Sequence, residues 1–597
     1  MDISGRFVQV FLGTQIGIKE KIGKVEIIID QEIGRETKKD NRSSFHEYSR
    51  IVHNSMARSF SIMSLLFFSI VNMMAQPDSR FRPFDWILYK GPGTIKSITE
   101  GYTFAYIGTE TGGIKRFHLY GNYFDEPITT AQGLKDNSIN AVHFDKVTGL
   151  IWASSPQYVQ YSFSREGDWY SIELEKLGLS KFDHIQKIGS SSNYVWLHAR
   201  SSFIKIDHSS GVLIGIYPSP DEININWSSG PFIGDKGLME LFESYIMLDG
   251  WIFNGNELID EYGRRTNITT GFIGNHGNIY FGTQDGTIFH GTKTMETFSP
   301  VETHLKNTDV TSLFHSDDVL YVGSQDYVLS KGISKYNIRS SSSEHFPFEE
   351  TINMTPTPIF SIYHSDGELW AGGDGVILYY NEKDDYWRTL GQNRGVPPGK
   401  IYDIHGNRTH VWIGSSRGLG RIENSTLSND PIGIEHIFDN ISIFDIDSID
   451  NSLWFGTRTG IYIYSNIHSQ LTQMSDVGRK SFPEQLRNVV AIEEHGEVIY
   501  VVSDVGIVNF DIEEKVWELM FNSGIYRNET VYSMALNDKF IFLGLNNGLI
   551  KINKRTGLVR DYVFPFIGRV NALVVDGKEI WLGTSNGLIK FSWKRDL

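Results

Sequence analysis

The 597-residue chain contains no cysteine. Disulfide bonds, thiolate nucleophiles and zinc sites with thiolate ligands are therefore excluded. None of the 18 histidines belongs to an H-E-x-x-H motif or to another spacing typical of metal ligands. The sequence thus predicts neither a metal site nor a cofactor.

Basic residues are also scarce, with 55 Lys and Arg against 71 Asp and Glu, which gives a net charge of −16. An acidic surface repels phosphate backbones, so we do not expect nucleic acid as a partner. Hydrophobic residues make up 40% of the chain and aromatic residues 13%. This composition is typical of a well-packed globular protein rich in β-forming residues.

One segment has the pattern of a targeting signal. Residues 56–75 carry Arg58 near their start, an apolar stretch over 62–71 and Ala75 at their end. This pattern predicts a signal peptide cleaved after Ala75, and export to the periplasm or the extracellular space. The apolar run is shorter than the about 20 residues of a membrane span, so we expect no span in the mature chain.

Residues 1–55 precede this signal, although a signal peptide normally begins close to the initiating methionine. We expect Met56 to be the native start, which makes residues 1–55 a non-native or disordered extension. The alternative is an uncleaved anchor with a small cytoplasmic tail. Neither interpretation gives residues 1–55 a function.

A short phrase recurs about a dozen times: an aromatic between apolar residues, Gly-Thr or Gly-Ser, a turn, Gly and an alternating strand. Clear copies lie at 411–418, 453–460 and 580–591, and a degenerate copy surrounds Met247. Apart from the copy around Met247, the aromatic positions of the copies are Tyr106, Trp152, Trp196, Tyr280, Tyr321, Trp370, Trp412, Trp454, Tyr500, Phe542 and Trp581. A period of about 40–45 residues with strand signals throughout predicts a β-propeller, in which each repeat forms one four-stranded blade.

The last repeat contains only three of its four strands. Its innermost strand is predicted at 570–575, its second at 579–583 and its third at 587–592, close to the end of the chain. Residues 84–89 have the pattern of an outermost strand that no repeat precedes. We therefore expect this N-terminal strand to complete the last blade, which removes exposed sheet edges.

About twelve blades exceed the four to eight of an ordinary ring. We therefore predict an all-β fold of two propellers within residues 76–597. The periodicity is weakest over 208–270, where we expect the boundary between the rings; the alternative is a boundary elsewhere in the chain. If the two ends of the chain pair, one propeller contains both termini and the other is inserted into it.

The phrase at 411–418 resembles the two-component regulator propeller repeat, and similar segments cover nearly all of residues 83–597. In that family the repeats form periplasmic sensor propellers of hybrid histidine kinases in Bacteroidetes, which commonly sense glycans. They also occur in secreted proteins, including a component of the type IX secretion machinery. The Met-Ala-Gln at 74–76 likewise resembles signal peptides of such bacteria. The resemblance implies an exported binding propeller; because no kinase follows the last blade, we expect no signalling output.

Two copies of the phrase satisfy the G-x-S-x-G pattern of a serine nucleophile, at 414–418 and 583–587. That motif needs a strained turn from a strand into a helix. Both copies fall instead in the turn between the second and third strands, where other repeats carry Asn546 or Asp285. We interpret these serines as turn residues and predict no catalytic residue.

We expect functional residues at positions where a repeat departs from the recurring phrase. Arg417 and Arg458 replace small or polar residues in adjacent turns, and two guanidiniums suit a carboxylate or sulfate ligand. The alternative is solvated charge on a turn. Asp285, Asp326 and Asp374 lie in similar turns and offer oxygen ligands to a hard cation. Asp is also favoured in turns for its own backbone hydrogen bonds.

Three functions remain open at this stage. The favoured hypothesis is an exported, non-enzymatic propeller that binds a glycan or an envelope protein at one of its faces. The second is a structural component of the cell envelope or secretion machinery. The third is a glycan lyase or hydrolase, whose channel residues would come from many blades and so escape motif searches.

Overall fold

The computed structural model describes residues 81–596 apart from 163–167, 181, 233–235, 256, 276, 302–304, 307, 326–331, 347, 349–353 and 479–484. The predicted signal peptide, the preceding residues 1–55 and Asp326 lie outside the described residues. In the described part, no helix is both long and apolar enough to cross a membrane.

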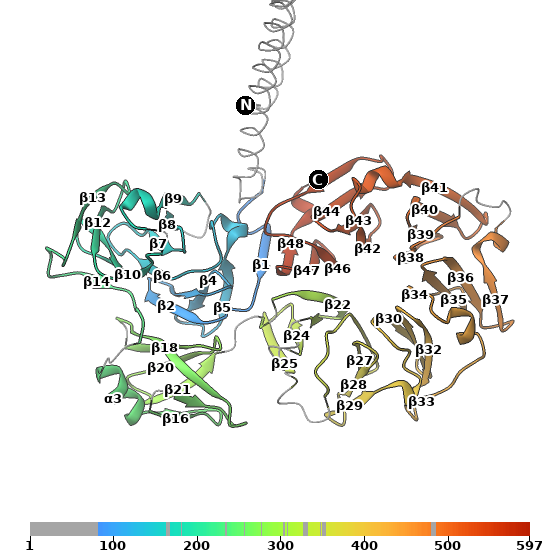
Figure 1. Ribbon diagram of the computed structural model, residues 1–597, viewed down its shortest axis with the longest axis horizontal. Coiled ribbons are helices and arrows are strands. Elements are labelled where there is room, and N and C mark those ends of the chain that lie inside the picture. The colour runs from blue at the N-terminus through green and yellow to red at the C-terminus, as the bar shows by residue number, and fades with distance from the viewer. Residues whose placement is uncertain are drawn as a thin grey trace, which may run out of the picture. The chain divides into compact units, whose positions relative to one another are not determined.

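Strands build eleven sheets in the described part of the chain, most of them with four antiparallel strands in sequence order. Seven sheets form one ring, and the other four form a smaller ring (Figure 1). The prediction of an all-β propeller protein is confirmed.

The larger ring has seven blades, and the first strand of each blade is innermost. Its strands are β22 (Val310–Ser316), β23 (Val319–Ser324), β24 (Ile333–Asn337), β25 (Ser342–Phe346), β26 (Ser361–Ser365), β27 (Glu368–Gly372), β28 (Ile377–Asn381), β29 (Tyr386–Leu390), β30 (Ile401–Gly406), β31 (His410–Ser415), β32 (Gly418–Glu423), β33 (Ser428–Asn429), β34 (Ile443–Ile449), β35 (Ser452–Thr457), β36 (Gly460–Ser465), β37 (Gln470–Gln473), β38 (Ala491–His495), β39 (Val498–Val502), β40 (Gly506–Asp511), β41 (Val516–Asn522), β42 (Val531–Leu536), β43 (Phe540–Leu545), β44 (Gly548–Asn553), β45 (Val559–Tyr562), β46 (Val570–Asp576), β47 (Glu579–Thr584) and β48 (Gly587–Phe591). The innermost strands are neighbours in chain order, and β46 returns to β22, so the ring is closed (Figure 1).

The N-terminal strand β1 (Trp86–Tyr89) completes the last blade. It pairs antiparallel with β48, beginning with Trp86 opposite Phe591. The aromatic side chains of Trp86 and Phe591 stack with their ring centres 3.7 Å apart. Arg595 forms an ion pair of 2.5 Å with the buried Asp85 just before β1. The predicted closure by the N-terminal strand is confirmed, and the smaller ring is inserted between β1 and β22.

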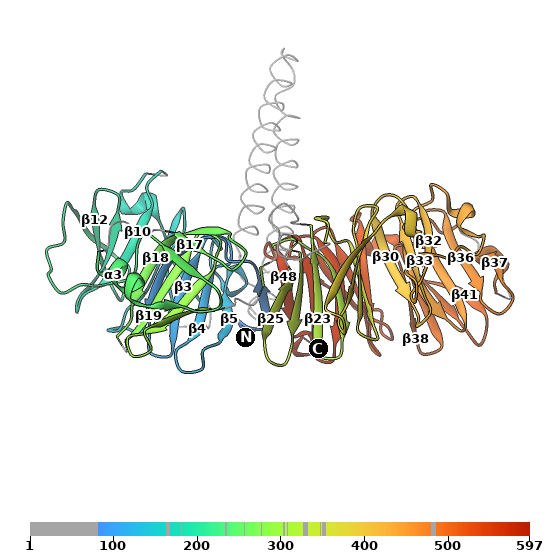
Figure 2. The ribbon, with the colours of Figure 1, turned by 90° about the horizontal axis from the view of Figure 1, so that it is seen from below.

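The smaller ring contains two regular blades and two enlarged ones. Its strands are β2 (Ile95–Glu100), β3 (Phe104–Thr109), β4 (Ile114–His118), β5 (Phe124–Ile128), β6 (Ala141–Phe144), β7 (Ile151–Ser154), β8 (Tyr158–Ser162), β9 (Tyr170–Glu173), β10 (Ile185–Ser190), β11 (Tyr194–Ala199), β12 (Phe203–Asp207), β13 (Leu213–Tyr217), β14 (Asn226–Trp227), β15 (Ile246–Met247), β16 (Ile252–Asn254), β17 (Glu257–Ile259), β18 (Arg265–Ile273), β19 (Asn278–Thr283), β20 (Ile288–Thr292) and β21 (Thr297–Val301). Strands β18, β2, β6 and β10 are the innermost ones and neighbour each other in that order. In Figure 2 the strands of each ring run across its thickness.

The segment 226–231 links three of these innermost strands. Its first part, β14, pairs with β10, and Pro231 bridges to Thr270 in β18. Between them, Ser229 donates its backbone N–H to the Ile98 carbonyl at 2.9 Å and accepts the Ile98 N–H on its hydroxyl at 2.6 Å. The segment therefore joins β10, β2 and β18 in place of a further blade.

Two expectations for residues 208–270 were wrong. The degenerate copy around Met247 forms no blade, because β15 instead pairs in parallel with β21. The chain passes between the rings after β21, and not within 208–270. The periodicity is weak there because β14, the helix α3 (Lys236–Ser244) and β15–β17 are additions to two blades of one ring.

Packing between blades explains the first glycine of the phrase. A Cβ atom at Gly414 would lie 2.9 Å from Ile443 Cγ2, and one at Gly583 would lie 2.8 Å from Val310 Cγ1. Ile443 and Val310 each begin the innermost strand of the next blade. A side chain at these glycines would push neighbouring blades apart.

Hydrogen bonds explain the rest of the phrase. Thr584 Oγ1 donates to the Gly587 carbonyl at 2.8 Å, and Gly587 has a φ of 135°, a conformation that favours glycine. The hydroxyls of Ser416 and Ser585 each accept, at 3.1 Å, a backbone N–H from the loop before an innermost strand. The serines of the two G-x-S-x-G copies are hydrogen-bonded turn residues, which agrees with their interpretation above.

Candidate functional site

The turns between second and third strands, and the loops that lead into the innermost strands, form one rim of the larger ring. Arg417 lies in the turn after β31 and Arg458 in the turn after β35, and both are exposed. The Asn440 N–H donates to the Arg417 carbonyl at 3.0 Å, and the Arg458 N–H donates to the Ser442 carbonyl at 2.9 Å. The segment 440–442 therefore links the two turns directly.

The same backbone pattern extends the rim in both directions. Asp374 forms an isolated bridge with Lys400, whose carbonyl is bonded to the turn that holds Arg417. On the other side, the Arg458 carbonyl accepts a 3.2 Å bond from the residue after Arg487. Lys400, Arg417, Arg458 and Arg487 thus follow one another along three blades, and all four are exposed.

Asp285 belongs to the smaller ring, and its carboxylate accepts hydrogen bonds from neighbouring threonines. Its Oδ1 accepts hydrogen bonds from the hydroxyls of Thr283 and Thr266, the latter at 3.0 Å, and its Oδ2 accepts one from Thr287 at 3.1 Å. The structure therefore does not bring Asp285 together with the other predicted ligand-binding residues. Among the described residues, no three or more acidic or histidine side chains are arranged to hold a metal ion.

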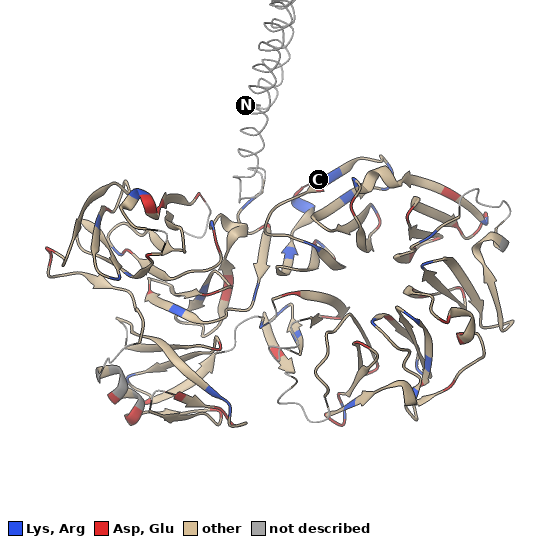
Figure 3. Cartoon of the chain, in the orientation of Figure 1, with Lys and Arg blue, Asp and Glu red and all other residues tan. Residues whose placement is uncertain are grey.

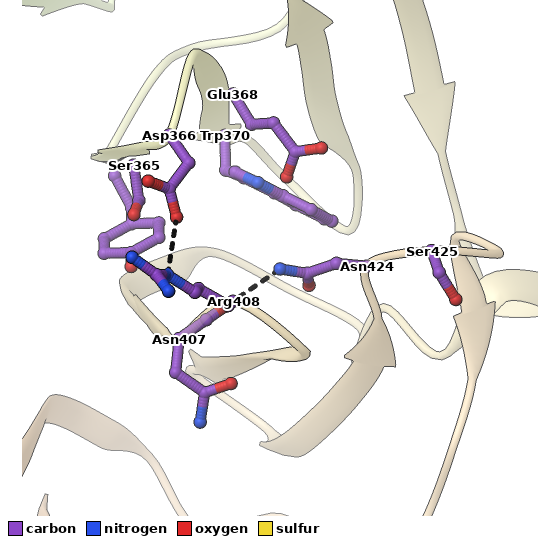
Figure 4. Close-up of a pocket in the computed structure, with 9 residues that line it drawn as sticks. Ser365, Asp366, Glu368, Trp370, Asn407, Arg408, Asn424 and Ser425 are labelled. Carbon is purple, nitrogen blue, oxygen red and sulfur yellow. Dashed lines mark hydrogen bonds and ion pairs between the residues drawn. The ribbon is translucent and has the colours of Figure 1, made fainter.

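Three adjoining cavities form a groove between the blade of β26–β29 and the blade of β30–β33. The first, of about 200 Å³, is drawn in Figure 4. The second and third have volumes of about 580 and 550 Å³. Glu368 and Asn424 line both the first and the second cavity, and Tyr386 and Arg388 line both the second and the third.

Asn424 lies at the junction of the first two cavities. Its Nδ2 donates to the Asn407 carbonyl at 2.9 Å, whereas its Oδ1 is buried and has no hydrogen-bond donor among the described residues (Figure 4). In the same cavity the Arg408 guanidinium lies 3.6 Å from Asp366 and so is already paired. The wall of the groove therefore holds one buried acceptor that has no donor among the described residues.

The second cavity combines polar and charged groups with an aromatic ring. Tyr379 Oη donates to Glu368 at 2.8 Å and accepts a hydrogen bond from Asn381 at 3.3 Å. Burial raises the pKa of Tyr379 to about 12, so this phenol keeps its proton at neutral pH. The Tyr386 ring is 43% exposed, with the Arg388 guanidinium 5.3 Å from its centre. Such a wall suits a ligand with many hydroxyls and an apolar ring face.

A second set of groups lies on the innermost strands β30, β34 and β38. Asp403 Oδ2 accepts the Ile446 N–H at 2.8 Å, and Asp445 accepts the Ile492 N–H. Each bond therefore joins one innermost strand to the next. The equivalent position of β26 is Ser361, which also bonds to the following innermost strand.

The pKa values of these acidic groups are strongly perturbed. Burial raises the pKa of Asp403 to about 7 and that of Glu493 to about 8, and the charge of Asp447 contributes to both. Burial and the charges of Asp403 and Asp447 raise the pKa of Asp445 well above its usual range. Burial also lowers the pKa of His405, on β30. Asp403, Asp445, Asp447 and Glu493 are here called the acidic row. Several of its carboxyl groups are therefore uncharged at mildly acidic pH.

Neither the groove nor the acidic row was predicted from the sequence. The row does have a sequence signal, because Ile-Tyr-Asp-Ile at 401–404 and Ile-Phe-Asp-Ile at 443–446 place Asp where Ser312 and Ser533 stand in other blades. The groove has no such signal, since its lining comes from separate strands and turns of two blades.

No family model matches the chain, and no curated protein matches it. Among solved structures it is similar to the extracellular domains of two hybrid two-component system proteins from B. thetaiotaomicron. One has 14% identity and a TM-score of 0.40, covering 83% of this chain and 70% of that domain. The other has 13% identity and a TM-score of 0.39, covering 84% and 81%.

The WD40 β-propeller domain of Doa1 is also similar, with 13% identity, a TM-score of 0.36, and coverage of 47% of this chain and 92% of that domain. These similarities concern the fold. A fold does not determine a function, so the function has to follow from the groups described above.

Proposed function

We propose that the protein is an exported, non-enzymatic propeller that binds a glycan in the groove between the blades of β26–β29 and β30–β33. The observation that carries this proposal is Asn424 Oδ1, a buried acceptor without a donor where two cavities meet. A buried polar atom left without a partner costs about 1–3 kcal/mol. A ligand hydroxyl would relieve this cost once the Asn424 side chain turned its Oδ1 toward the cavity, and the exposed ring of Tyr386 would support the apolar face of a sugar.

The charges of the first two cavities favour a ligand without strong charge of its own. The second cavity is lined by the negative charges of Glu368 and Asp384 and by the positive charge of Arg388. In the first cavity, Arg408 is paired with Asp366. A neutral glycan can bond to groups of both signs through its hydroxyls, whereas an ion of either sign meets repulsion from one of them.

A glycan array with the full chain, followed by calorimetry on a retained glycan, tests the proposal. We expect Tyr386→Ala and Asn424→Ala each to weaken binding roughly 10-fold, because each removes one stacking or hydrogen-bonding contact. Tyr170→Ala is the matched control, since Tyr170 is a 61% exposed tyrosine on the outermost strand β9. Equal weakening by Tyr386→Ala and Tyr170→Ala would contradict the groove.

The export and the partner class are part of the same proposal. Signal cleavage after Ala75 predicts that the mature protein begins with Gln76, which N-terminal sequencing of the secreted protein checks. Retention of no glycan, together with co-purification of envelope proteins, would favour a structural component of the envelope or secretion machinery. Arg417, Arg458 and, at the end of the same rim, Asp374 remain proposed ligand contacts outside the groove.

The acidic row favours glycan cleavage as a second candidate function. A general acid must carry its proton near the working pH, and the raised pKa of Glu493 meets this requirement beside the charge of Asp447. The test is to incubate a retained glycan with the protein and measure new reducing or unsaturated ends. Cleavage that Glu493→Gln abolishes would replace the binding proposal, and intact glycan would leave it in place.

A further inference from the structure

The four basic residues Lys400, Arg417, Arg458 and Arg487, here called the basic rim, are unusual for this chain. They are consecutive along the rim of three blades, in a protein of net charge −16. Figure 3 shows charges of both signs spread over the described residues. We propose that the basic rim is a second binding surface, separate from the groove, and that its ligand is an anionic polysaccharide carrying carboxylate or sulfate groups.

The basic rim is left without compensating charge. Elsewhere in the larger ring, Arg421 pairs with Asp430 at 2.9 Å and Arg527 pairs with Asp561 at 2.6 Å. None of the four side chains of the basic rim forms an ion pair with a described residue. A run of unpaired cations concentrates positive potential on one face and attracts an anionic ligand.

Acidic neighbours do not cancel this potential. Asp504 is the nearest carboxylate to Arg487 in the hydrogen-bond pattern, and its Oδ1 accepts the Arg487 backbone N–H at 2.9 Å rather than the guanidinium. Asp374 lies at the far end, where its backbone bridges to Lys400. Asp439 is exposed and directly precedes Asn440, and it too forms no ion pair with a side chain of the basic rim among the described residues. The stretch from Lys400 to Arg487 therefore presents four cations that no carboxylate pairs.

The backbone of the rim argues against a small inorganic anion as the intended ligand. Phosphate and sulfate are usually held by free backbone N–H groups of a turn. Here the Ser416 N–H donates to the Lys400 carbonyl at 2.8 Å, and the Arg458 N–H donates to the Ser442 carbonyl at 2.9 Å. The Arg417 N–H donates to the Ser415 hydroxyl at 3.0 Å. Only the side chains are available, and they extend over three blades, which requires an extended ligand.

Aromatic rings beside the basic rim favour a polysaccharide over an acidic peptide. The Lys400 ammonium lies 5.0 Å from the centre of the Phe360 ring. Tyr402 and Phe444 begin just inside the rim, are half-buried, and have ring centres 5.4 Å apart. An acidic sugar presents apolar ring faces together with its charges, so aromatic and guanidinium groups recognise it jointly.

Binding of the full chain to dextran sulfate, with neutral dextran of the same length as the comparison, tests this inference. The double variant Arg417→Gln/Arg458→Gln removes two charges of the basic rim. The control Arg555→Gln/Lys578→Gln removes two exposed, unpaired charges from turns at the opposite end of the strands. The measurement is fluorescence anisotropy of labelled polymer at about 50 mM and about 300 mM salt, which differ in screening length.

We expect the rim variant to bind dextran sulfate about 10-fold more weakly at the lower salt, through loss of two charge-assisted contacts, with a smaller salt dependence. The control variant should match the parent chain, and neutral dextran should not compete. Equal loss in both variants, or no binding of dextran sulfate, would overturn the proposal. Rim-dependent binding of poly-glutamate in preference to dextran sulfate would also overturn it, in favour of an acidic protein partner. This outcome does not depend on the groove. The groove is tested separately, by binding of a neutral glycan and by the variant Asn424→Ala.

Discussion

Neutralising Asp403 should stabilise the larger ring at alkaline pH and change little at acidic pH. The pKa of Asp403 is raised in the folded ring from an ordinary value of 3.8 to about 7. The protonated carboxyl therefore contributes stability that is fully present below pH 3.8 and is lost as the pH rises through about 7. Asp403→Asn keeps an oxygen for the Ile446 N–H and never becomes charged.

The magnitude follows from the two pKa values. Their difference corresponds to about 4 kcal/mol of unfavourable free energy for the ionised form in the folded ring. Asp403 is only half-buried, so water screens part of this, and we expect Asp403→Asn to gain about 2 kcal/mol at about pH 8.5. For a ring of this size the gain corresponds to roughly 4–8 °C in the unfolding midpoint.

The assay is thermal unfolding followed by tryptophan fluorescence at about pH 4 and about pH 8.5, because the raised pKa lies between them. Glu513→Gln serves as the control, since it removes the same charge from an exposed turn between β40 and β41. The reasoning would be refuted if Asp403→Asn lowered the midpoint equally at both pH values. It would also be refuted if Glu513→Gln gave the same gain at the higher pH.

Two further expectations concern the closure of the larger ring. Asp596→Asn should lower the unfolding midpoint by several degrees in the same assay, because it weakens the 2.5 Å ion pair with Arg560 near the C-terminus; an unchanged midpoint would mean that this contact does not hold the ring closed. Gly583→Ala should destabilise the ring by about 1–3 kcal/mol, since the new Cβ atom would lie 2.8 Å from Val310 Cγ1 where the last blade meets the first. Urea unfolding checks this, with Gly577→Ala as the comparison because open space surrounds a Cβ there, and equal losses would argue against the inter-blade clash.

The architecture was predictable because one local rule is repeated in almost every blade. The glycine of the phrase is fixed by the next innermost strand, as at Gly414 against Ile443, and the following Thr or Ser closes its own turn. Both constraints involve neighbours in a fixed register, so they appear in the sequence with a regular period. The same logic made the N-terminal strand recognisable, since a blade without its outermost strand exposes an edge.

The prediction failed where the chain departs from that rule. Over 208–270 the strands β14–β17 and the helix α3 extend existing blades, and nothing in their spacing distinguishes an extension from a boundary between rings. The groove was inaccessible for a different reason. Asn424 and Tyr386 belong to different blades, and only the packing of those blades brings them to one cavity.

The acidic row could have been found by comparing innermost strands instead of turns. In three blades of the larger ring the position holds serine. In two of them the hydroxyl donates to the carbonyl of the first residue of the next innermost strand, Ser361 to Ile401 at 3.2 Å and Ser533 to Val570 at 3.4 Å. Asp403 instead accepts the Ile446 N–H at 2.8 Å, so it bonds to a donor of the next innermost strand where serine bonds to an acceptor. A break in a repeat is most informative where the repeat imposes a specific hydrogen bond, because the replacing side chain must find another partner.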